Sequence, residues 1–505
     1  MKLEIIPNEC SSDSEPEVDE GEQDGTSEQS NTDSEEKQID KKCLNETGSG
    51  DANLIWPLRH SLFPHIPPYI CFSSHDSPIP MKFPMGGKFF KWKLTTITPI
   101  LVRQTLSNSG FSLVRTRGVG IKVINKWSQL PKKMSLVVQK YIPNPYLING
   151  SKFDLRLYVL VTSFHPLRIY LYPDGLARFA SAKYSDDSKD LKDRYRHLTN
   201  YSINKLSDQY TANEDANACQ GHKWTLSKLM EYLEGKGVNS RSLWKNLQQL
   251  VIKTMISAEG PITQLCEENM NSIYNCYELF GVDVLLDVEL KPWLLEVNIS
   301  PSLHSASPLD AHVKGPMVQT LFDMAQFHIP SKATASNSTP SSFNPKLYTM
   351  SLTKNERLKH ANYEEYVDRN DYLHEIVEQL NGDDVRQLAR AEDEYAAKGR
   401  FERIFPTAHT HKYLEFMEPR YYNRLFDAWE AKYGSRRQEG INYLKTLCSQ
   451  RIHLKTAASS KIRKNSLSMT PGDRKLQPSK EGQTLPLEEI LRNTSIASEV
   501  LVCAN

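Results

Sequence analysis

The sequence predicts an α+β fold for the central part of the chain, and two observations support this prediction. β-Rich runs bounded by Pro and Gly occupy residues 135–142, 151–163 and 167–174. Helical patterns occupy residues 224–257, where the turn GKGVN separates two of them. Strand-like and helix-like segments therefore alternate between about residues 114 and 328, as expected of an α+β domain. With 505 residues and 39% hydrophobic content, the chain can bury a large core.

The segments that flank this domain differ from it in composition. Residues 1–53 form an acidic, Ser-rich leader, which we predict to be disordered because it cannot bury enough apolar surface to offset the entropy of ordering. Residues 331–345 form a polar linker. Residues 346–454 show charge-dense helical patterns and predict a helical extension. The tail, residues 455–505, is polar and is predicted to be disordered.

Charge and cysteine content exclude several classes of function. The net charge of +1 gives no overall electrostatic basis for binding nucleic acid. The 8 cysteines show no C-x-x-C spacing, so neither a zinc site nor a disulfide framework is expected. No apolar run is long enough for a signal peptide or a membrane span. We expect a monomeric protein of the cytoplasm or cytoskeleton, with no nucleic-acid or membrane partner.

The segment 276–305 (CYELFGVDVLLDVELKPWLLEVNISPSLHS) carries the clearest candidate site. It predicts two strands joined by a tight turn near Glu289 and Leu290. With this turn, Leu285 lies opposite Leu294 on the neighbouring strand. Side chains alternate between the two faces of a strand, so one face of the hairpin is apolar. The apolar face holds Val282, Val284, Leu286, Trp293, Leu295 and Val297.

The other face of the predicted hairpin gathers oxygen ligands. Asp283 lies opposite Glu296 in this register, and Asn298 shares the same face. Two facing acids repel unless a cation lies between them, and two carboxylates with an amide oxygen suit Mg²⁺ that also carries nucleotide phosphates. The alternative is a half-exposed hairpin whose polar side chains simply face water.

Several motifs, in order, resemble the tubulin–tyrosine-ligase-like family. They are SKFDLRLYVLVTS at 151–163, IYLYPDGLARFAS at 169–181, HLTNYSINK at 197–205 and ELKPWLLEVNISPSLHS at 289–305. Within this family the chain most resembles the polyglutamylases, in particular the member regarded as an initiating glutamylase. The resemblance runs from about Trp92 to Pro330. It implies an ATP-grasp-like core at 114–330, preceded at 54–113 by the remnant of an N-terminal lobe.

The resemblance also implies ATP and Mg²⁺ as cofactors and assigns residues to them. Asp283, Glu296 and Asn298 would bind the metal. Arg117 and Gly118 belong to an R-G-x-G turn whose backbone amides can approach phosphate oxygens. The implied ATP-binding residues are Arg117, Gly118, Gln139, Lys140, Tyr141, Ile142, Lys152, Phe153, Asp154, Thr199 and Asn200. Without the resemblance, the triplet Lys152-Phe153-Asp154 is more typical of a solvated turn.

The substrate side of the implied site is cationic and hydroxyl-bearing. Arg178 would clamp a carboxylate of the amino-acid substrate through its planar fork, whereas its alternative is an ordinary surface arginine. Tyr201, Ser202 and Lys205 would hold the same substrate. The candidate catalytic residues are the cations Arg117, Lys152 and Arg178, because such a site works by positioning and charge neutralisation. A lone His197 more often caps or packs than catalyses.

The sequence departs from the family pattern before the R-G-x-G turn. A complete member has a V-K-P strand there, whose lysine contacts ATP, and several tens of further residues. In this chain LVRQTLSNSGFSL runs directly into VRTRGVGIKVINKW, and the nearest cations, Arg115 and Lys122, lie at other positions. Loss of a phosphate-binding cation lowers the rate of phosphoryl transfer by orders of magnitude. We interpret the chain as a spliced or mis-assembled form of an otherwise conventional enzyme.

Three functions compete on these observations. The first is an ATP-dependent ligase that adds free L-glutamate to glutamate side chains in acidic tails of tubulin, and of other acidic proteins, through an acyl phosphate. The second is an inactive form that binds tubulin or another acceptor. The third is a glycine ligase, which Arg178 disfavours because it recognises a side-chain carboxylate. The first function implies a cytoskeletal location, with the cilium or basal body as an option, and the helical extension could bind microtubules or pack against the core.

Overall fold

The computed structural model describes most of the predicted core and helical extension. The described residues are 58–74, 76–77, 121–124, 137–187, 189–270, 272, 276–299, 301–305, 307–328, 344–349, 352–455 and 501–504. The predicted acidic leader, the polar linker, most of the tail and the R-G-x-G turn with Arg117 and Gly118 lie outside them.

A seven-stranded sheet forms the centre of the molecule, and all its strand pairs are antiparallel. Its main path runs in the order β10-β9-β6-β7-β11, while β5 pairs with β6 and β8 pairs with β7. Its strands are β5 (Leu147–Ile148), β6 (Ser151–Phe164), β7 (Leu167–Phe179), β8 (Lys223–Thr225), β9 (Glu278–Leu286), β10 (Pro292–Asn298) and β11 (Glu402–Phe405). The α+β prediction is confirmed.

One strand continues past residue 174, where we expected a β-rich run to end. β7 continues through Gly175 to Phe179, whereas the sequence pattern predicted that the β-rich run ends at residue 174. At this point the side chain of Asp174 accepts hydrogen bonds from the backbone of Gly175 and Ser227. Gly175 is required there, since a Cβ would lie 2.3 Å from the carbonyl oxygen of Arg156.

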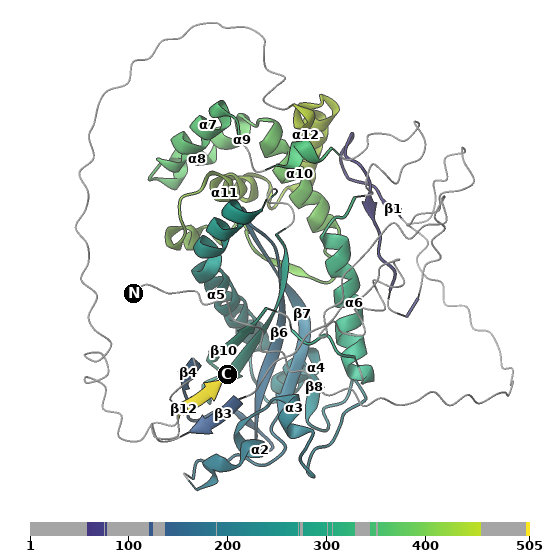
Figure 1. Ribbon diagram of the computed structural model, residues 1–505, viewed down its shortest axis with the longest axis vertical. Coiled ribbons are helices and arrows are strands. Elements are labelled where there is room, and N and C mark those ends of the chain that lie inside the picture. Colours follow the sequence, from purple (N-terminus) through teal and green to yellow (C-terminus); the bar gives the residue numbers. More distant parts are fainter. Residues whose placement is uncertain are drawn as a thin grey trace, which may run out of the picture.

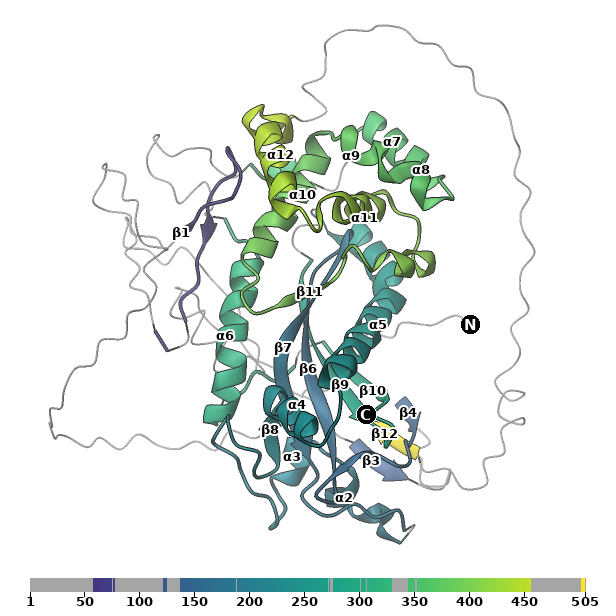
Figure 2. The ribbon, with the colours of Figure 1, turned by 180° about the vertical axis from the view of Figure 1, so that it is seen from behind.

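Helices cover both faces of the sheet (Figure 1), and the reverse view shows the same three layers (Figure 2). On one face lie α4 (Leu226–Gly235) and α5 (Ser240–Asn269), which bury Leu155, Leu157 and Val282. The turn predicted between these two helices is confirmed, and Thr225 and Asn239 cap their N-termini. On the other face lies α6 (Pro308–Met324), which packs on Tyr158 and Leu160.

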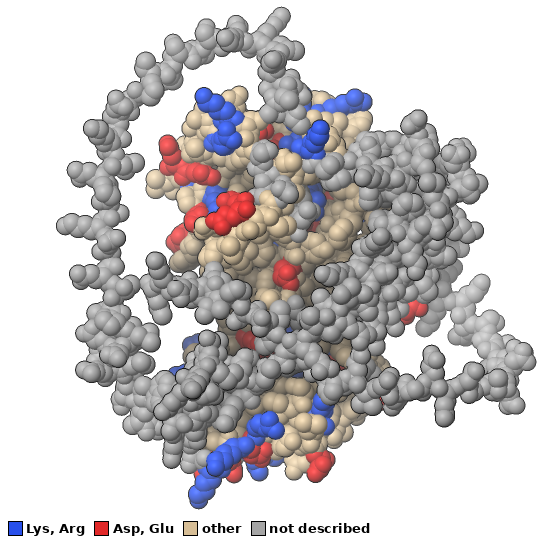
Figure 3. All heavy atoms as spheres, viewed as in Figure 1, with Lys and Arg blue, Asp and Glu red and all other residues tan. Residues whose placement is uncertain are grey.

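The helical extension forms a separate apolar cluster around Trp429 and Leu388. Its helices are α7 (Lys354–Glu364), α8 (Arg369–Leu373), α9 (Glu375–Glu378), α10 (Gly382–Ala396), α11 (Tyr421–Tyr433) and α12 (Arg437–Ser449). Basic side chains (Lys or Arg, blue) and acidic side chains (Asp or Glu, red) both occur over this region in Figure 3. Charges of both signs are interleaved on that face, so charge alone does not define a binding surface.

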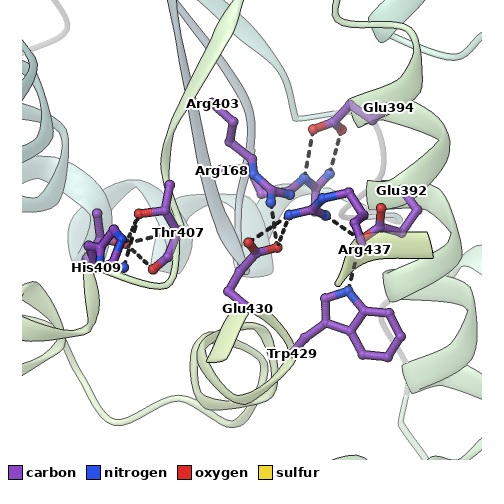
Figure 4. Close-up of polar contacts among 10 residues, drawn as sticks. Arg168, Glu392, Glu394, Arg403, Thr407, His409, Trp429, Glu430 and Arg437 are labelled. Carbon is purple, nitrogen blue, oxygen red and sulfur yellow. Dashed lines mark hydrogen bonds and ion pairs between the residues drawn. The ribbon is translucent and has the colours of Figure 1, made fainter. Parts of the chain in front are cut away.

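The extension packs against the core. Strand β11, which the helical pattern did not predict, leaves the extension and pairs with β7. Thr162 and Arg168, from the core strands, donate to Glu394 of α10, and the Arg168 bonds are 3.1 and 3.0 Å long. Figure 4 shows this pair beside a second network, in which Arg403 and Arg437 both bind Glu430. The two regions therefore share one sheet and one buried ionic layer.

A segment near the N-terminus links α6 to α10. It contains β1 (Leu58–Arg59) and β2 (Tyr69–Ile70), which pair with each other. Asp393 of α10 accepts hydrogen bonds from Ser61 Oγ (2.5 Å) and Tyr69 Oη (2.9 Å). Asp323 of α6 accepts one from the backbone of Phe72 (3.0 Å). The described part of the predicted N-terminal remnant is thus anchored to both regions.

A small sheet lies near the start of β6 and includes a strand from the tail. Its order is β3-β12-β4, from β3 (Ile121–Ile124), β12 (Leu501–Ala504) and β4 (Val137–Lys140). Both ladders are antiparallel. Four residues of the tail are therefore a strand where we expected disorder, because the polarity of the whole tail outweighed the short apolar run LVCA in our prediction.

Short 3₁₀ segments and two short helices complete the described structure. They are η2 (Asp190–Lys192), α2 (Arg194–His197), α3 (Tyr201–Asn204), η5 (Pro345–Tyr348), η6 (His411–Phe416) and η7 (Ile452–Leu454). Among the helices that the structure describes, none combines the length and the apolar character needed to cross a bilayer.

Candidate active site

Strand register brings the charged residues of the core onto one face of the sheet. Arg178 of β7 lies opposite Asp154 of β6 on one side and Lys223 of β8 on the other. Two residues further along β6, Arg156 lies opposite Asp283 of β9. Because side chains alternate along each strand, these five side chains point to the same face, the one that α6 covers only in part. The elements that carry this face or lie beside it, β8, α3 and β10, are found in the lower half of Figure 1.

Two arginines and two aspartates form a buried ionic network on this face. Arg156 donates to Asp283 through Nε (2.5 Å) and Nη2 (3.1 Å). Arg178 donates to Asp154 through Nε (2.9 Å) and Nη2 (2.5 Å), and Nη2 also donates to Asp283 (2.8 Å). All four side chains are less than a tenth exposed. A network of this kind holds each group in a fixed orientation.

The arginines change the charge argument for a metal ion at Asp283. Burial alone would raise the pKa of Asp283, but Arg156 and Arg178 outweigh it and hold the pKa below its usual range. The carboxylate is therefore ionised and already neutralised by protein cations. We expected repulsion between Asp283 and Glu296 to require a metal, and that reasoning was wrong because it omitted Arg156.

The register of the β9–β10 hairpin is confirmed at its polar residues and wrong near its turn. Asp283 pairs with Glu296 as predicted, but Leu285 pairs with Trp293 instead of Leu294. A bulge between Leu294 and Glu296 shifts the register by one residue. Trp293 consequently points outward with 38% exposure, and its indole nitrogen donates to Asp287 (2.7 Å).

The oxygen donors of the predicted metal site remain suitable for Mg²⁺. Oδ1 of Asp283 accepts the Arg156 Nε bond, and a carboxylate oxygen has a second acceptor position for a cation. Asn298 donates its amide nitrogen to the carbonyl of Gly281 (3.3 Å), which leaves its oxygen for a ligand. Glu296 is exposed on the same face. Within the described ranges, no three His, Cys, Asp or Glu side chains are grouped to hold a metal ion.

Lys152 provides a buried cation at the start of β6. Its ammonium donates to the hydroxyl of Tyr141 (3.2 Å) and lies 4.3 Å from the centre of that ring. Burial lowers the pKa of Lys152 to about 8, and the nearby Asp154 opposes this shift. The ammonium is therefore charged near neutral pH and suited to bind an anion such as a phosphate.

The other predicted nucleotide residues differ in exposure. Gln139 is exposed and donates to the carbonyl of Leu295 (2.6 Å), which ties β4 to β10. Phe153 is fully buried in the core beneath α4 and α5, so only its backbone could contact a ligand. Lys140 is exposed, Ile142 half-buried and Thr199 buried, while the carbonyl of Asn200 accepts the first backbone bonds of α3.

The predicted substrate residues lie beside a lysine that the sequence pattern did not single out. The ammonium of Lys223 lies 4.5 Å from the centre of the Tyr201 ring, and that of Lys205 lies 5.6 Å from it. Ser202 is half-buried on the same short helix. Lys223 is also the register partner of Arg178, so two cations face the same space. A lone G-H-K-W stretch gives no local signal of this role.

Asp310 and Lys314, near the N-terminus of α6, hold Lys223 in place. Asp310 binds Lys223 (2.8 Å) and Lys314 (2.8 Å), and Lys314 also donates to the carbonyl of His304 (2.6 Å). Burial would raise the pKa of Asp310, but the two lysines lower it to about 2. Sequence reasoning missed these residues because the SPLD and HVK segments read simply as the start of a helix.

Comparison with known proteins identifies the domain that carries these residues. Residues 112–337 match the model of the tubulin-tyrosine ligase family. This domain belongs to that family. The match confirms the resemblance that the motifs indicated, and with it the ATP-grasp-like class of the core.

Proteins of this family named as tubulin glutamylases resemble the chain over most of its length. Human tubulin monoglutamylase TTLL4 is 37% identical over 511 residues, which cover 80% of this chain and 42% of the relative. Tubulin polyglutamylase ttll-4 of Caenorhabditis elegans is 40% identical, covering 66% and 55%. Mouse tubulin polyglutamylase TTLL5 is 38% identical, covering 58% and 23%. The chain thus spans less than two thirds of each relative.

Proposed function

We propose that this chain is an ATP-dependent protein glutamate ligase. It would join the amino group of free L-glutamate to the side-chain carboxylate of a glutamate in an acidic tail, through an acyl phosphate of that carboxylate. The observation that carries the proposal is the single charged face of the sheet. There a hard-oxygen set (Asp283, Glu296 and Asn298) lies next to two cations in register, Arg178 and Lys223.

The oxygen set and Lys152 would hold the nucleotide and its metal. Asp283, Glu296 and Asn298 would bind Mg²⁺, and Lys152 would bind a phosphate of ATP. ATP supplies the phosphoryl group that activates the acceptor carboxylate, and Mg²⁺ neutralises phosphate charge. Arg156 keeps Asp283 ionised and oriented, so that the oxygen set is formed before a ligand arrives.

Arg178 and Lys223 would bind the incoming amino acid. The three hydrogen bonds of Arg178 to the aspartates come from Nε and Nη2, so a substrate carboxylate would meet Nη1. Lys223 adds a second positive charge over Tyr201. Two cations match the two carboxylates of glutamate better than the single carboxylate of glycine. This favours glutamate over glycine as the added amino acid.

Tubulin is the proposed acceptor, because the similar proteins are named for acting on it. Other acidic proteins remain proposed acceptors on the same chemistry. The proposed location follows from the acceptor and is the cytoskeleton, including the cilium or basal body, for a monomeric protein. The interleaved charges of the helical extension give no separate support for microtubule binding there.

An inactive, acceptor-binding form is the second candidate function. The observation that favours it is the absence of the V-K-P lysine from the sequence before the R-G-x-G turn. The retained oxygen set and the buried Lys152 favour the ligase instead, because a binding protein has no use for either.

The test is incorporation of labelled glutamate into tubulin by the purified chain with Mg²⁺-ATP, beside a Glu296→Gln variant. We expect incorporation by the unmodified chain and its loss in the variant, since an exposed side chain such as Glu296 can change without unfolding the core. A folded, monodisperse chain that incorporates no glutamate would overturn the ligase and leave the acceptor-binding form. Replacing glutamate by labelled glycine checks the choice of amino acid.

A further inference from the structure

His197 lies at the end of a hydrogen-bonded chain that begins at Lys152. Three separate parts of the chain supply these residues: Lys152 is the second residue of β6, Tyr141 follows β4, and His197 ends α2. Lys152 Nζ lies 3.2 Å from Tyr141 Oη, and Tyr141 Oη lies 3.0 Å from His197 Nδ1. His197 Nε2 lies 3.2 Å from the backbone carbonyl oxygen of Asp190. The His197 side chain is only 2% exposed, so protein groups and not water surround its ring.

The chemistry of the end group fixes the direction of every bond. A carbonyl oxygen only accepts, so His197 must donate from Nε2 to Asp190. In a neutral imidazole with its proton on Nε2, Nδ1 accepts, and its donor must be the hydroxyl of Tyr141. The Tyr141 oxygen then presents its lone pairs to the Lys152 ammonium and to the hydroxyl of Tyr184, which can only donate to it in this arrangement. The chain therefore runs from Lys152 through Tyr141 and His197 to Asp190, with one donor and one acceptor at each link.

A charged His197 would break this order. A protonated imidazole carries a hydrogen on Nδ1 as well, so Tyr141 could no longer donate to it. It would also place a second positive charge near the Lys152 ammonium. Burial lowers the pKa of His197, and the charge of Lys152 lowers it further. The groups that face His197 from the elements around it are Lys152, Tyr141, Tyr184, Asp190 and Asp193.

We propose that neutral His197 is a positioning residue that, through Tyr141, aims the Lys152 ammonium at a phosphate of ATP. The proposal rests on the ATP site proposed above and adds a residue to it. His197 itself touches neither nucleotide nor substrate. Its role is to make Tyr141 an acceptor toward Lys152, so that the ammonium is held by a neutral oxygen and keeps its charge for the ligand.

A pH dependence of ATP binding follows from this arrangement. The depressed pKa means that His197 is neutral at pH 7 and becomes charged only as the pH falls below its ordinary value of 6.5. ATP affinity should therefore be flat near neutrality and fall about tenfold once the pH is low enough to charge His197, because the hydrogen-bonded chain is then lost. The loss should appear in the Kd for ATP, because the ammonium contacts the bound nucleotide.

Two variants separate positioning from a merely structural role. In His197→Asn, the side-chain oxygen can replace Nδ1 as the acceptor from Tyr141 and cannot become charged. In His197→Gln, the amide reaches the Nε2 position and keeps only the donor to Asp190. We expect His197→Asn to bind ATP at pH 7.5 within about threefold of the unmodified chain and to lose the acidic fall in affinity, whereas His197→Gln should weaken binding about tenfold. Tyr141→Phe should behave like His197→Gln.

The experiment combines calorimetric titration with Mg²⁺-ATP between pH 5.5 and 8 and nitrogen NMR of ¹⁵N-histidine-labelled chain. NMR should show a neutral His197 with its proton on Nε2, and circular dichroism should show all three variants folded. A proton on Nδ1, or an acidic fall in affinity that persists in His197→Asn, would overturn the inference. If the unmodified chain binds ATP but incorporates no glutamate, the ligase proposal fails while this inference can still hold. Absence of ATP binding would overturn both.

Discussion

Lys152 shows how burial tunes a single residue toward a task. A lysine in water keeps its charge to high pH, but burial lowers the pKa of this one to about 8. Its charge is therefore lost as the pH rises through about 8, while an unfolded chain would keep it to about pH 10.5. A buried lysine whose pKa lies this close to neutral pH is suited to bind an anionic ligand in a site that excludes water.

ATP affinity should accordingly fall on the alkaline side as well. Above pH 8 we expect Kd for Mg²⁺-ATP to rise about tenfold per pH unit until binding no longer depends on Lys152. Lys152→Arg keeps its charge at every accessible pH, so its affinity should be weaker at pH 7 but independent of pH between 8 and 9.5. Calorimetric titration over this range checks the prediction. An identical alkaline fall in both chains would contradict it.

Glu278, at the start of β9, is a half-buried ionisable group with a consequence for stability. Burial raises its pKa to about 7, so the folded chain holds a proton that the unfolded chain releases above about pH 4.5. The contribution of Glu278 to the free energy of unfolding is fully present below pH 4.5 and is lost as the pH rises through 7. Glu278→Gln should therefore raise the free energy of unfolding at pH 8 by up to about 3 kcal/mol and leave it unchanged near pH 4.5. Urea unfolding at the two pH values measures this difference.

At the scale of elements, β7 depends on the backbone contact at Gly175. A methyl group there would lie 2.3 Å from the Arg156 carbonyl oxygen, which belongs to the neighbouring strand and cannot move alone. Gly175→Ala should lower the free energy of unfolding by about 3 kcal/mol and disturb Arg156 together with its bonds to Asp283. Gly235→Ala is the matched control, because nothing lies within 4 Å of the added methyl group. Thermal unfolding should show no loss in the control, and equal effects of both substitutions would refute this account of β7.

At the scale of the whole molecule, we expect the core and the helical extension to unfold as one unit. They share the β7–β11 ladder and the Arg168–Glu394 pair, whose side chains are 3% and 2% exposed. Desolvated charges tolerate the loss of a partner poorly. The contacts that support the family domain at residues 112–337 therefore come in part from residues after its end.

Breaking the buried ion pair tests this unity. Glu394→Gln leaves the Arg168 guanidinium buried without its counter-charge, and we expect a loss of about 3 to 5 kcal/mol in the free energy of unfolding. Arg436→Ala removes one partner of the exposed Arg436–Glu439 pair and should change stability by less than about 1 kcal/mol. Denaturant unfolding should show a single transition for the parent chain. Separate transitions for core and extension would contradict one folding unit.

Several features of the site follow from local sequence alone. Alternation along a strand placed Asp283, Glu296 and Asn298 on one face, whereas the pairing of Asp283 with Glu296 also needs the bulge between Leu294 and Glu296. The same reasoning failed at Trp293, because a bulge adds a residue to one strand and no composition signal marked it. Lys223 escaped notice because its role comes from being opposite Arg178 on another strand.

The sequence by itself determined the long central strands, the two helices behind the sheet, the family of the domain and the shared face of Asp283, Glu296 and Asn298, since these depend on periodicity and on motifs within short stretches. Only the tertiary structure decided which charges meet. It placed Arg156 and Arg178 on Asp283, Lys223 beside Arg178, and His197 behind Tyr141. The physical reason is that charge pairing and burial depend on distances between segments far apart along the chain, which local patterns do not encode.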